Sequence, residues 1–417
     1  MSCNWPLSTL GDFVSLFTGF PFKSKQFSDV EGTKLLRGDN VAQGTLRWEN
    51  VKRWTDENLV DKHKNYLLRE SDVILAMDRP WIEAGLKFSQ IESRDLPCYL
   101  VQRVACLRAN DPDDQDFLKF IIGSRAFTEY VKLVQTGTAV PHISGKQILA
   151  FEFRLPPKDI RLSIGKTLSD IDRKVSINTQ TNQTLEQIAQ AIFKSWFVDF
   201  DPVKAKMKGE QPEGMDAATA SLFPEKLVES ELGLIPEGWE LKKIGDVVER
   251  YSVGKKYSQK TAVETGLVPI LDQGKSGIIG YHNDSPGVKA SLDDPIIVFA
   301  NHTCYMKLVT YDFSAIQNVL PFKLNGCDIY WSYLATQGRQ SFVEYKGHWP
   351  DFMIHEIVIP SETLMQRFGD IVKPLYSQMA SNENQNKSLA KLRDTLLPKL
   401  LSGEIELGQA QELAEVE

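Results

Sequence analysis

Cysteine is scarce in this sequence of 417 residues, and its placement excludes several kinds of site. No two of the five cysteines have the C-x-x-C spacing of a zinc or redox centre, which predicts buried free thiols. Long apolar runs are absent as well, and the first six residues lack the basic and then apolar order of a signal peptide. We therefore expect a cytoplasmic protein that does not cross a membrane.

Sequence motifs for catalysis are also missing. Gly274-Lys275-Ser276 resembles the end of a Walker A loop, but Pro269 stands where the first glycine should be. The chain contains no G-x-G-x-x-G, H-E-x-x-H or G-x-S-x-G motif, and the double proline at 156–157 lacks the neighbours of an adenine methyltransferase motif. We predict a chain that is not an enzyme and that binds no metal or cofactor itself.

The acidic residues are concentrated in two segments. The formal net charge is −7, but residues 199–240 carry −6 and residues 404–417 carry −5, so the remainder carries +4. A nearly neutral domain can still gather its lysines and arginines on one face. The acidic balance of the whole chain therefore does not exclude a nucleic-acid partner.

An internal repeat organises the chain. Residues 5–14 match residues 239–248, and residues 164–196 lie without gaps over residues 368–400. In the second match, apolar residues recur at steps of three and four, which predicts one apolar stripe along a helix. About 40 helical residues would be roughly 60 Å long. So long and narrow a stripe is typical of a coiled-coil seam.

Asparagines replace apolar residues in the middle of both stripes. A polar seam residue costs stability but fixes register, so we expect Asn182 and Asn386 to meet near its centre; a frayed helix is the alternative. Pro374 should start or kink the second helix. The predicted seam consists of Leu168, Ile171, Val175, Asn178, Asn182, Leu185, Ile188 and Ile192, with Leu375, Met379, Asn382, Asn386, Leu389, Leu392 and Leu396.

The repeat unit is a mixed segment followed by a long helix. The mixed segments contain short β-rich runs, such as residues 73–76 and 100–107, and short helical patterns, separated by Gly, Asp and Asn turns. This predicts an α+β fold with two globular domains and two long antiparallel coiled-coil helices. The expected segments are a domain at 1–155, a helix at 156–198, a mobile acidic linker at 199–238, a domain at 239–360, a helix at 361–403 and an acidic tail at 404–417.

Loops of both domains mix cationic, amide and aromatic residues. Arg and Lys read guanine edges and anchor phosphates, while Asn and Gln read adenine, so such loops suit the grooves of DNA. Solvated loops of similar composition are common, but the recurrence in both copies favours DNA. The candidates are Lys23, Lys25, Arg37, Asn40, Arg47, Lys52, Arg53, Arg79, Trp81, Thr138, His142 and Lys146, then Lys255, Lys256, Tyr257, Lys260, Gln273, Lys275, Asn301, His302, Lys346 and His348.

A series of short motifs follows a fixed order along nearly the whole chain. It includes Leu10-Gly11-Asp12, residues 36–40, residues 137–144, residues 195–202, residues 235–239 and residues 396–405. Taken together, these motifs resemble the specificity subunits of type I restriction-modification systems, which act in defence against foreign DNA. The second copy departs from the pattern at residues 347–351 and 371–375, which puts that loop and that helix start in doubt.

The resemblance implies a function for each part. Each domain would be a target-recognition domain that reads one half of an asymmetric, bipartite site in double-stranded DNA. The helices would set the gap and dock two methyltransferase subunits that bind S-adenosylmethionine. Separate restriction and translocase subunits would use ATP and Mg. The alternatives are the same module serving a stand-alone adenine methyltransferase or another defence complex, a coiled-coil protein scaffold, or an undetected nuclease or methylase.

Overall fold

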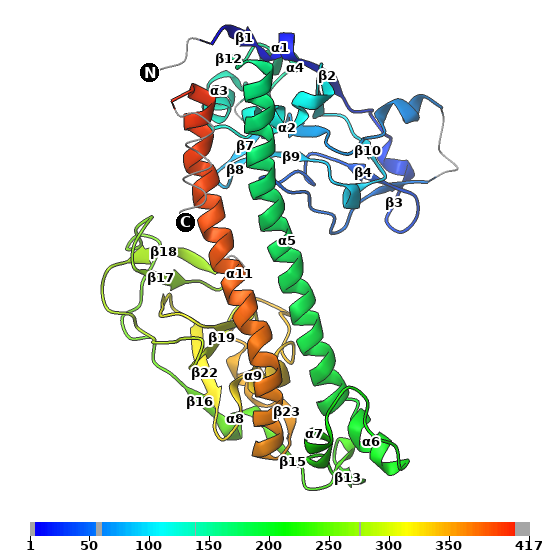
Figure 1. The fold of residues 1–417 in the computed structure, drawn as a ribbon, viewed down its shortest axis with the longest axis vertical. Helices are drawn as coiled ribbons and strands as arrows, with labels where there is room; N and C mark the ends of the chain where they lie inside the picture. Colours follow the sequence, from blue (N-terminus) through cyan, green and yellow to red (C-terminus); the bar gives the residue numbers. More distant parts are fainter. Residues whose placement is uncertain (1–4, 56–60, 138, 275–276, 405–417) are drawn as a thin grey trace. The chain divides into compact units, whose positions relative to one another are not determined.

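The computed structural model describes residues 5–55, 61–137, 139–274 and 277–404 (Figure 1). The chain divides into two compact units. Unit 1 consists of residues 1–177 with 385–417, and unit 2 consists of residues 178–384. Two long helices, α5 (Lys158–Phe197) and α11 (Glu362–Ser402), each contribute one part to each unit. Among the described helices, none is both long and apolar enough to span a lipid bilayer.

The domain of unit 1 contains an antiparallel sheet with strand order β2-β11-β6-β9 and a second sheet with order β10-β4-β5-β3. In the second sheet, β10 and β4 run parallel. Strands β1 and β12 form a separate pair. The strands are β1 (Leu7–Thr9), β2 (Val14–Thr18), β3 (Phe27–Ser28), β4 (Thr33–Leu36), β5 (Arg53–Trp54), β6 (Val73–Ala76), β7 (Trp81–Ile82), β8 (Gly85–Leu86), β9 (Phe88–Gln90), β10 (Cys98–Leu100), β11 (Val104–Ala109) and β12 (Glu152–Arg154). Its short helices are α1 (Leu10–Phe13), α2 (Gln115–Ile122), α3 (Arg125–Val134) and α4 (Gly145–Leu149).

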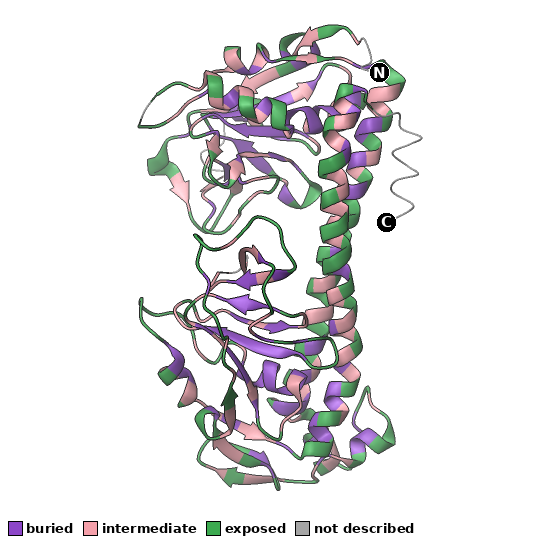
Figure 2. Ribbon diagram, turned by 90° about the vertical axis from the view of Figure 1, so that its left-hand side faces the viewer, coloured by how far each residue is buried: buried purple, intermediate pink, exposed green. Residues whose placement is uncertain are grey.

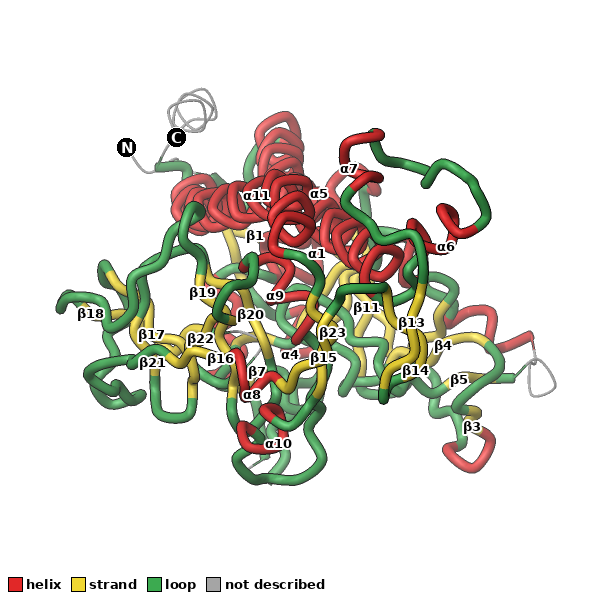
Figure 3. Tube along the Cα trace, turned by 90° about the horizontal axis from the view of Figure 1, so that it is seen from below, coloured by secondary structure: helices red, strands yellow, loops and turns green. Residues whose placement is uncertain are grey.

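The domain of unit 2 repeats this connectivity. Its sheets have orders β16-β22-β19-β20 and β18-β17-β21, its β17 and β21 run parallel, and β15 pairs with β23. Its helices and strands can be followed in Figure 3. They are β15 (Glu240–Lys243), α8 (Ile244–Val247), β16 (Val248–Arg250), β17 (Val268–Leu271), β18 (Ile278–His282), β19 (Ile296–Ala300), β20 (Met306–Val309), β21 (Ser314–Ala315), β22 (Val319–Leu324), α9 (Ile329–Thr336), α10 (Trp349–Met353) and β23 (Glu356–Ile359).

Strand β6 shows why the central strands are continuous apolar runs. All four of its residues are buried. Figure 2 shows that strands inside both domains are largely buried. Successive side chains of a strand point to opposite faces. Val73 and Leu75 pack in the cluster that includes Phe117 of α2, whereas Ile74 and Ala76 belong to a second cluster. A strand covered on both faces needs apolar residues at every position, so the predicted run at 73–76 is confirmed as a strand.

The predicted run at 100–107 is wrong as a single strand. Strand β10 ends at Leu100 and β11 begins at Val104, so the residues between them form a turn. Arg103 has a φ of 65°, in the left-handed region, and its carbonyl accepts a hydrogen bond of 2.9 Å from the Met77 N–H. The turn reverses the chain between two sheets, which β-propensity alone does not register.

The long helices pack against each other in each unit. In unit 1, Leu168 near the start of α5 and Leu396 near the end of α11 are buried in one cluster. In unit 2, Phe193 near the end of α5 lies 5.8 Å, ring to ring, from Phe368 near the start of α11. The two helices are therefore antiparallel, as predicted. Helix α11 continues through the exposed Pro374, and its buried neighbours Val372 and Tyr376 anchor it there. Of the two effects expected of Pro374, a helix start or a kink, the start is therefore wrong.

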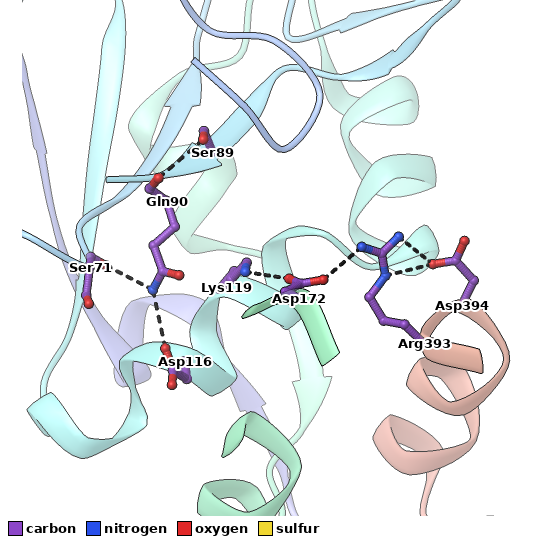
Figure 4. Close-up of polar contacts among 8 residues, drawn as sticks. All are labelled: Ser71, Ser89, Gln90, Asp116, Lys119, Asp172, Arg393 and Asp394. Carbon is purple, nitrogen blue, oxygen red and sulfur yellow. Dashed lines mark hydrogen bonds and ion pairs between the residues drawn. The ribbon is translucent and has the colours of Figure 1, made fainter. Parts of the chain in front are cut away.

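An ion-pair network anchors α11 to the domain of unit 1 (Figure 4). Asp172 of α5 accepts from Lys119 of α2 at 2.5 Å and from Arg393 of α11 at 2.9 Å, and Arg393 also pairs with Asp394 at 2.8 Å. Burial favours the neutral form of Arg393, but the hydrogen bonds and charges of the two carboxylates outweigh it and raise its pKa. One aspartate thus joins three helices.

We expect Asp172→Ala to lower the free energy of unfolding by about 1–3 kcal/mol, because it leaves Lys119 without its carboxylate partner and Arg393 with Asp394 alone. Asp170→Ala is the matched control, since that exposed aspartate lies on the same helix with a 3.6 Å pair to Arg173. The control should stay within about 0.5 kcal/mol. Urea unfolding followed by circular dichroism measures both; equal losses would contradict the anchoring role.

The asparagines of the seam do pair, with one change of partner. Within unit 2, Asn382 Nδ2 donates to Asn182 Oδ1 at 2.8 Å, and Asn182 Nδ2 donates to the Met379 carbonyl at 3.1 Å. We expected Asn386, one helical turn further along, as the partner of Asn182. The predicted seam is also wrong at Ile188, which is 43% exposed, because its neighbour Ala189 is the residue that turns inward and is fully buried. The other predicted seam residues are buried or half-buried.

The segment predicted as a mobile linker is folded onto unit 2. It forms α6 (Asp201–Met207), α7 (Ala217–Ser221) and the hairpin β13 (Leu227–Ser230) with β14 (Gly233–Pro236). Val203 and Phe223 are buried with Trp196 of α5. Arg367 of α11 binds Asp216 at 2.8 Å. Its acidic and Pro/Gly-rich composition suggested mobility, but these few apolar side chains are enough to attach it.

Candidate nucleic-acid interface

A cationic cleft of about 540 Å³ lies in unit 1 where strands end. It is lined by the segment that follows β4, the segment that follows β6, and the turn between β10 and β11. Four cations and two carboxylates face it: Arg37, Arg79, Lys87, Arg103, Asp39 and Asp78. This excess of positive charge favours an anionic ligand.

Asp78 is the central acceptor of this cleft. Its Oδ2 accepts from Arg103 at 2.7 Å, and its Oδ1 lies 2.7 Å from His142 Nδ1. Burial alone would raise the pKa of Asp78, but the hydrogen bonds and charges of Arg103 and His142 outweigh it and lower that pKa. The carboxylate therefore stays ionised and orients two donors at the rim of the cleft.

Backbone geometry directs the arginines. The backbone of Arg79 is left-handed, with a φ of 45°, and its N–H donates a hydrogen bond to the Pro141 carbonyl at 2.6 Å. The backbone of Arg103 is also left-handed. Such conformations are uncommon for arginine and cluster at functional sites. Lys87 is half-buried and donates a hydrogen bond to the Gly38 carbonyl. Burial lowers the pKa of Lys87. The positive charges of Arg47 and Arg79 lower this pKa further, whereas the negative charge of Asp39 raises it. These hydrogen bonds hold the loops in the conformation that lines the cleft.

The other candidates in unit 1 have varied surroundings. Lys23, Lys25, Arg47 and Lys146 are exposed. Three other candidates contact neighbouring residues. Lys52 pairs with Asp29, and Arg53 donates to the Gly32 carbonyl at 3.1 Å. The ring of Trp81 is covered by the Lys132 ammonium group at 4.4 Å. Thr138 lies outside the described residues.

Asn40 is wrong as a base reader, because it is buried and its amide is used by the backbone of Arg37 and Arg47.

A second cleft, of about 580 Å³, occupies the corresponding place in unit 2. It lies at the end of β19 and at the turn between β21 and β22, and Arg250, Lys256, Asn301, Gln317 and Asn318 line it. The turn between β21 and β22 corresponds closely to the turn between β10 and β11 of unit 1. Asn318 has a φ of 69°, and its carbonyl accepts a hydrogen bond from the Asn301 N–H at 2.9 Å. In unit 1, Arg103 is likewise left-handed and its carbonyl accepts from the Met77 N–H. Three arginines line the first cleft and one lines the second, where Asn318 stands in the place of Arg103, so the two clefts suit different ligands of one class.

Several candidates in unit 2 surround this cleft or support it. His302 lies 2.9 Å from Asn318 Nδ2, and Gln273 Oε1 accepts from the His302 N–H at 2.9 Å. Lys260 is exposed, Lys255 pairs with Asp284 at 2.7 Å and Lys346 pairs with Asp351 at 3.2 Å. Lys275 lies outside the described residues.

Two candidates are wrong as direct contacts because they are buried: Tyr257, which stacks on His282 at 4.1 Å, and His348.

Sequence reasoning missed several cleft residues: Lys87, Gln102, Arg103, Gln317 and Asn318. Gln102 and Arg103 were hidden inside a run taken for one strand. The available signal was a Gln-Arg pair interrupting an apolar run, which is what a turn between two buried strands requires.

Comparison with known proteins decides the family. The model of the type I restriction modification DNA specificity domain matches residues 3–187. The HindI specificity subunit of Haemophilus influenzae is 27% identical over 355 residues, which cover 70% of this chain and 77% of that one. The MjaIX specificity subunit of Methanocaldococcus jannaschii is 25% identical over 314 residues, or 70% and 69% of the two chains. Residues 3–187 thus match the type I DNA specificity domain, and the chain is similar to type I specificity subunits over 70% of its length.

A solved structure supports the fold of this specificity subunit. The S subunit of a type I restriction-modification system from M. genitalium superposes with a TM-score of 0.56 at 15% identity, covering 95% of this chain and 96% of that one. Its likeness extends over both domains and both long helices. The fold predicted from the repeat is therefore confirmed, and the family inferred from the motifs is confirmed with it.

Proposed function

We propose that this specificity subunit reads a bipartite sequence in double-stranded DNA, with one half-site recognised in each cleft. The observation that carries the proposal is the repeated cleft, formed by corresponding loops of two domains with the same connectivity. Because the domains differ in the side chains they present, the half-sites should differ and the whole site should be asymmetric.

The chemistry of each cleft suggests its reading mode. Arg79 and Arg103 present guanidinium groups that suit guanine edges or phosphates, and Asp78 orients one of them. Gln317 presents an exposed amide, which suits adenine. The amides of Asn301 and Asn318 are held by the Trp349 N–H at 2.8 Å and by His302 at 2.9 Å, so they would shape the cleft. The exposed lysines around the clefts would anchor the phosphates without reading sequence.

The remaining parts of the proposal concern partners. Two adenine methyltransferase subunits, which bind S-adenosylmethionine and flip the target base, would dock on the helical regions. Restriction and translocase subunits would bring ATP and Mg. The specificity subunit itself would be non-catalytic, hold no cofactor and act in the cytoplasm. Similarity to type I specificity subunits supports this division of labour.

Single-molecule sequencing of N6-methyladenine tests the proposal in cells with and without this gene and its neighbouring methyltransferase. We expect a split motif that appears only when both are present. A methylated motif that persists without this chain, or a complex of both proteins that methylates no motif, would overturn the proposal.

Salt should weaken DNA binding steeply, because each neutralised phosphate releases counterions. For about six phosphate contacts, we expect affinity to fall by about 10³-fold between 50 and 200 mM salt. Fluorescence anisotropy with cognate duplex and a scrambled duplex measures this. A flat response to salt would contradict binding through the cationic clefts.

A further inference from the structure

Unit 2 contains a pocket that the DNA-binding proposal does not use. It has a volume of about 260 Å³ and lies among α5, α9, α11 and the segment 305–311. Tyrosine dominates its wall, and we call it the tyrosine pocket. Its aromatic and charged lining residues are Tyr305, Tyr311, Tyr333, Tyr376, Glu186, Glu383 and Lys307.

One hydroxyl in this wall lacks a partner. Tyr376 is only 7% exposed, and its buried hydroxyl oxygen makes no hydrogen bond in the part of the chain that the structure describes. Buried polar atoms are almost always paired, so an orphan needs an explanation. The neighbouring Tyr333 hydroxyl does have a partner, since it accepts from Gln337 Nε2 at 3.0 Å. Burial raises the pKa of both phenols, which therefore stay neutral.

The charge of the tyrosine pocket is negative. Glu383 has Lys307 at 3.9 Å, the outer limit for an ion pair. Glu186 has two amides at 3.4 Å, from Gln190 and Gln337, and within the described residues no cation pairs with it. Aromatic faces beside a carboxylate that lacks a cation favour a cationic guest.

The internal repeat shows which group is missing. Under the 204-residue offset, Asp172 corresponds to Tyr376 and Arg393 corresponds to Ala189. Unit 1 therefore fills this position with its own guanidinium, which Asp172 holds at 2.9 Å. Unit 2 has the fully buried Ala189 at the position of that arginine, and Tyr376, at the position of Asp172, lines the tyrosine pocket.

We propose that the tyrosine pocket binds the guanidinium group of an arginine side chain presented by a methyltransferase subunit. Glu186 would accept from the guanidinium, the Tyr376 oxygen would gain a donor, and the tyrosine rings would supply cation–π contact. The ligand chemistry stands on the pocket itself; only the identity of the partner rests on the proposed function.

The first test uses the purified full chain and N-acetyl-arginine amide as the probe. We expect saturable shifts of tyrosine ring resonances in NMR, at least tenfold weaker binding by Glu186→Gln, and no binding of the neutral isostere N-acetyl-citrulline amide. Glu229→Gln, an exposed glutamate of the same unit, is the control and should bind like the unaltered chain. Equal binding of both probes, or of both variants, would overturn the proposal whether or not the chain recognises DNA.

The second test measures assembly with the methyltransferase subunit. Tyr376→Phe removes only an oxygen that has no partner, so a purely structural role predicts no change in assembly. We expect Tyr376→Phe and Glu186→Gln each to weaken assembly about tenfold, with DNA affinity of the chain unaltered. Unchanged assembly in both variants would overturn the choice of partner. If the unaltered chain does not assemble at all, the proposed function fails, and the first test still decides the pocket.

Discussion

Arg103→Asn is expected to reduce affinity for the cognate DNA by about 10- to 100-fold, equivalent to about 1–3 kcal/mol. The substitution removes a guanidinium from the cleft of unit 1 and leaves Asp78 with only His142. The loss should be greater for the cognate duplex than for a scrambled one, because a base-reading contact carries sequence information whereas a phosphate contact does not.

Asparagine is chosen because the backbone at position 103 is left-handed. Asn318 occupies the corresponding turn of unit 2 with a φ of 69°, so asparagine fits this conformation at little cost. Arg94→Ala is the matched control, since Arg94 is exposed, pairs with Glu92 at 2.8 Å and lies outside the cleft. Anisotropy titrations at fixed salt measure all three proteins. A variant of Arg103 that binds like the control would exclude this cleft as a reading site.

Phe368→Ala is expected to destabilise unit 2 by about 3–5 kcal/mol. Phe368 is fully buried and its ring lies 5.2 Å from Phe197 and 5.9 Å from Trp196. Truncation would leave a cavity where the start of α11 packs on the end of α5, and the surrounding rings cannot collapse fully into it.

Tryptophan fluorescence during urea unfolding measures this loss, since Trp196, Trp239, Trp331 and Trp349 are all buried in the core of unit 2. Leu232→Ala serves as the control because Leu232 is 56% exposed in the same unit, and it should change stability by less than about 0.5 kcal/mol. A midpoint for Phe368→Ala equal to that of the control would show that the helices are held by other contacts.

The sequence by itself determined the periodic features of this protein. Apolar residues spaced three and four positions apart predicted the ends of both long helices to within two residues. This worked because a helix that buries one stripe must repeat its apolar residues at that spacing. The run at 73–76 identified a central strand for the same reason, since burial on both faces demands apolar residues throughout. The order of the motifs identified the family.

Only the tertiary structure decided which residues form the clefts and the seam contacts. Asn40 and His348 have the composition of base readers, yet their polar atoms are used inside the domains, and composition does not reveal hydrogen-bond partners. Arg103 and Asn318 reach their clefts through left-handed turns between two sheets, which no local pattern specifies. The register that pairs Asn182 with Asn382 depends on where both helices dock on their domains, a long-range property that each helix alone does not contain.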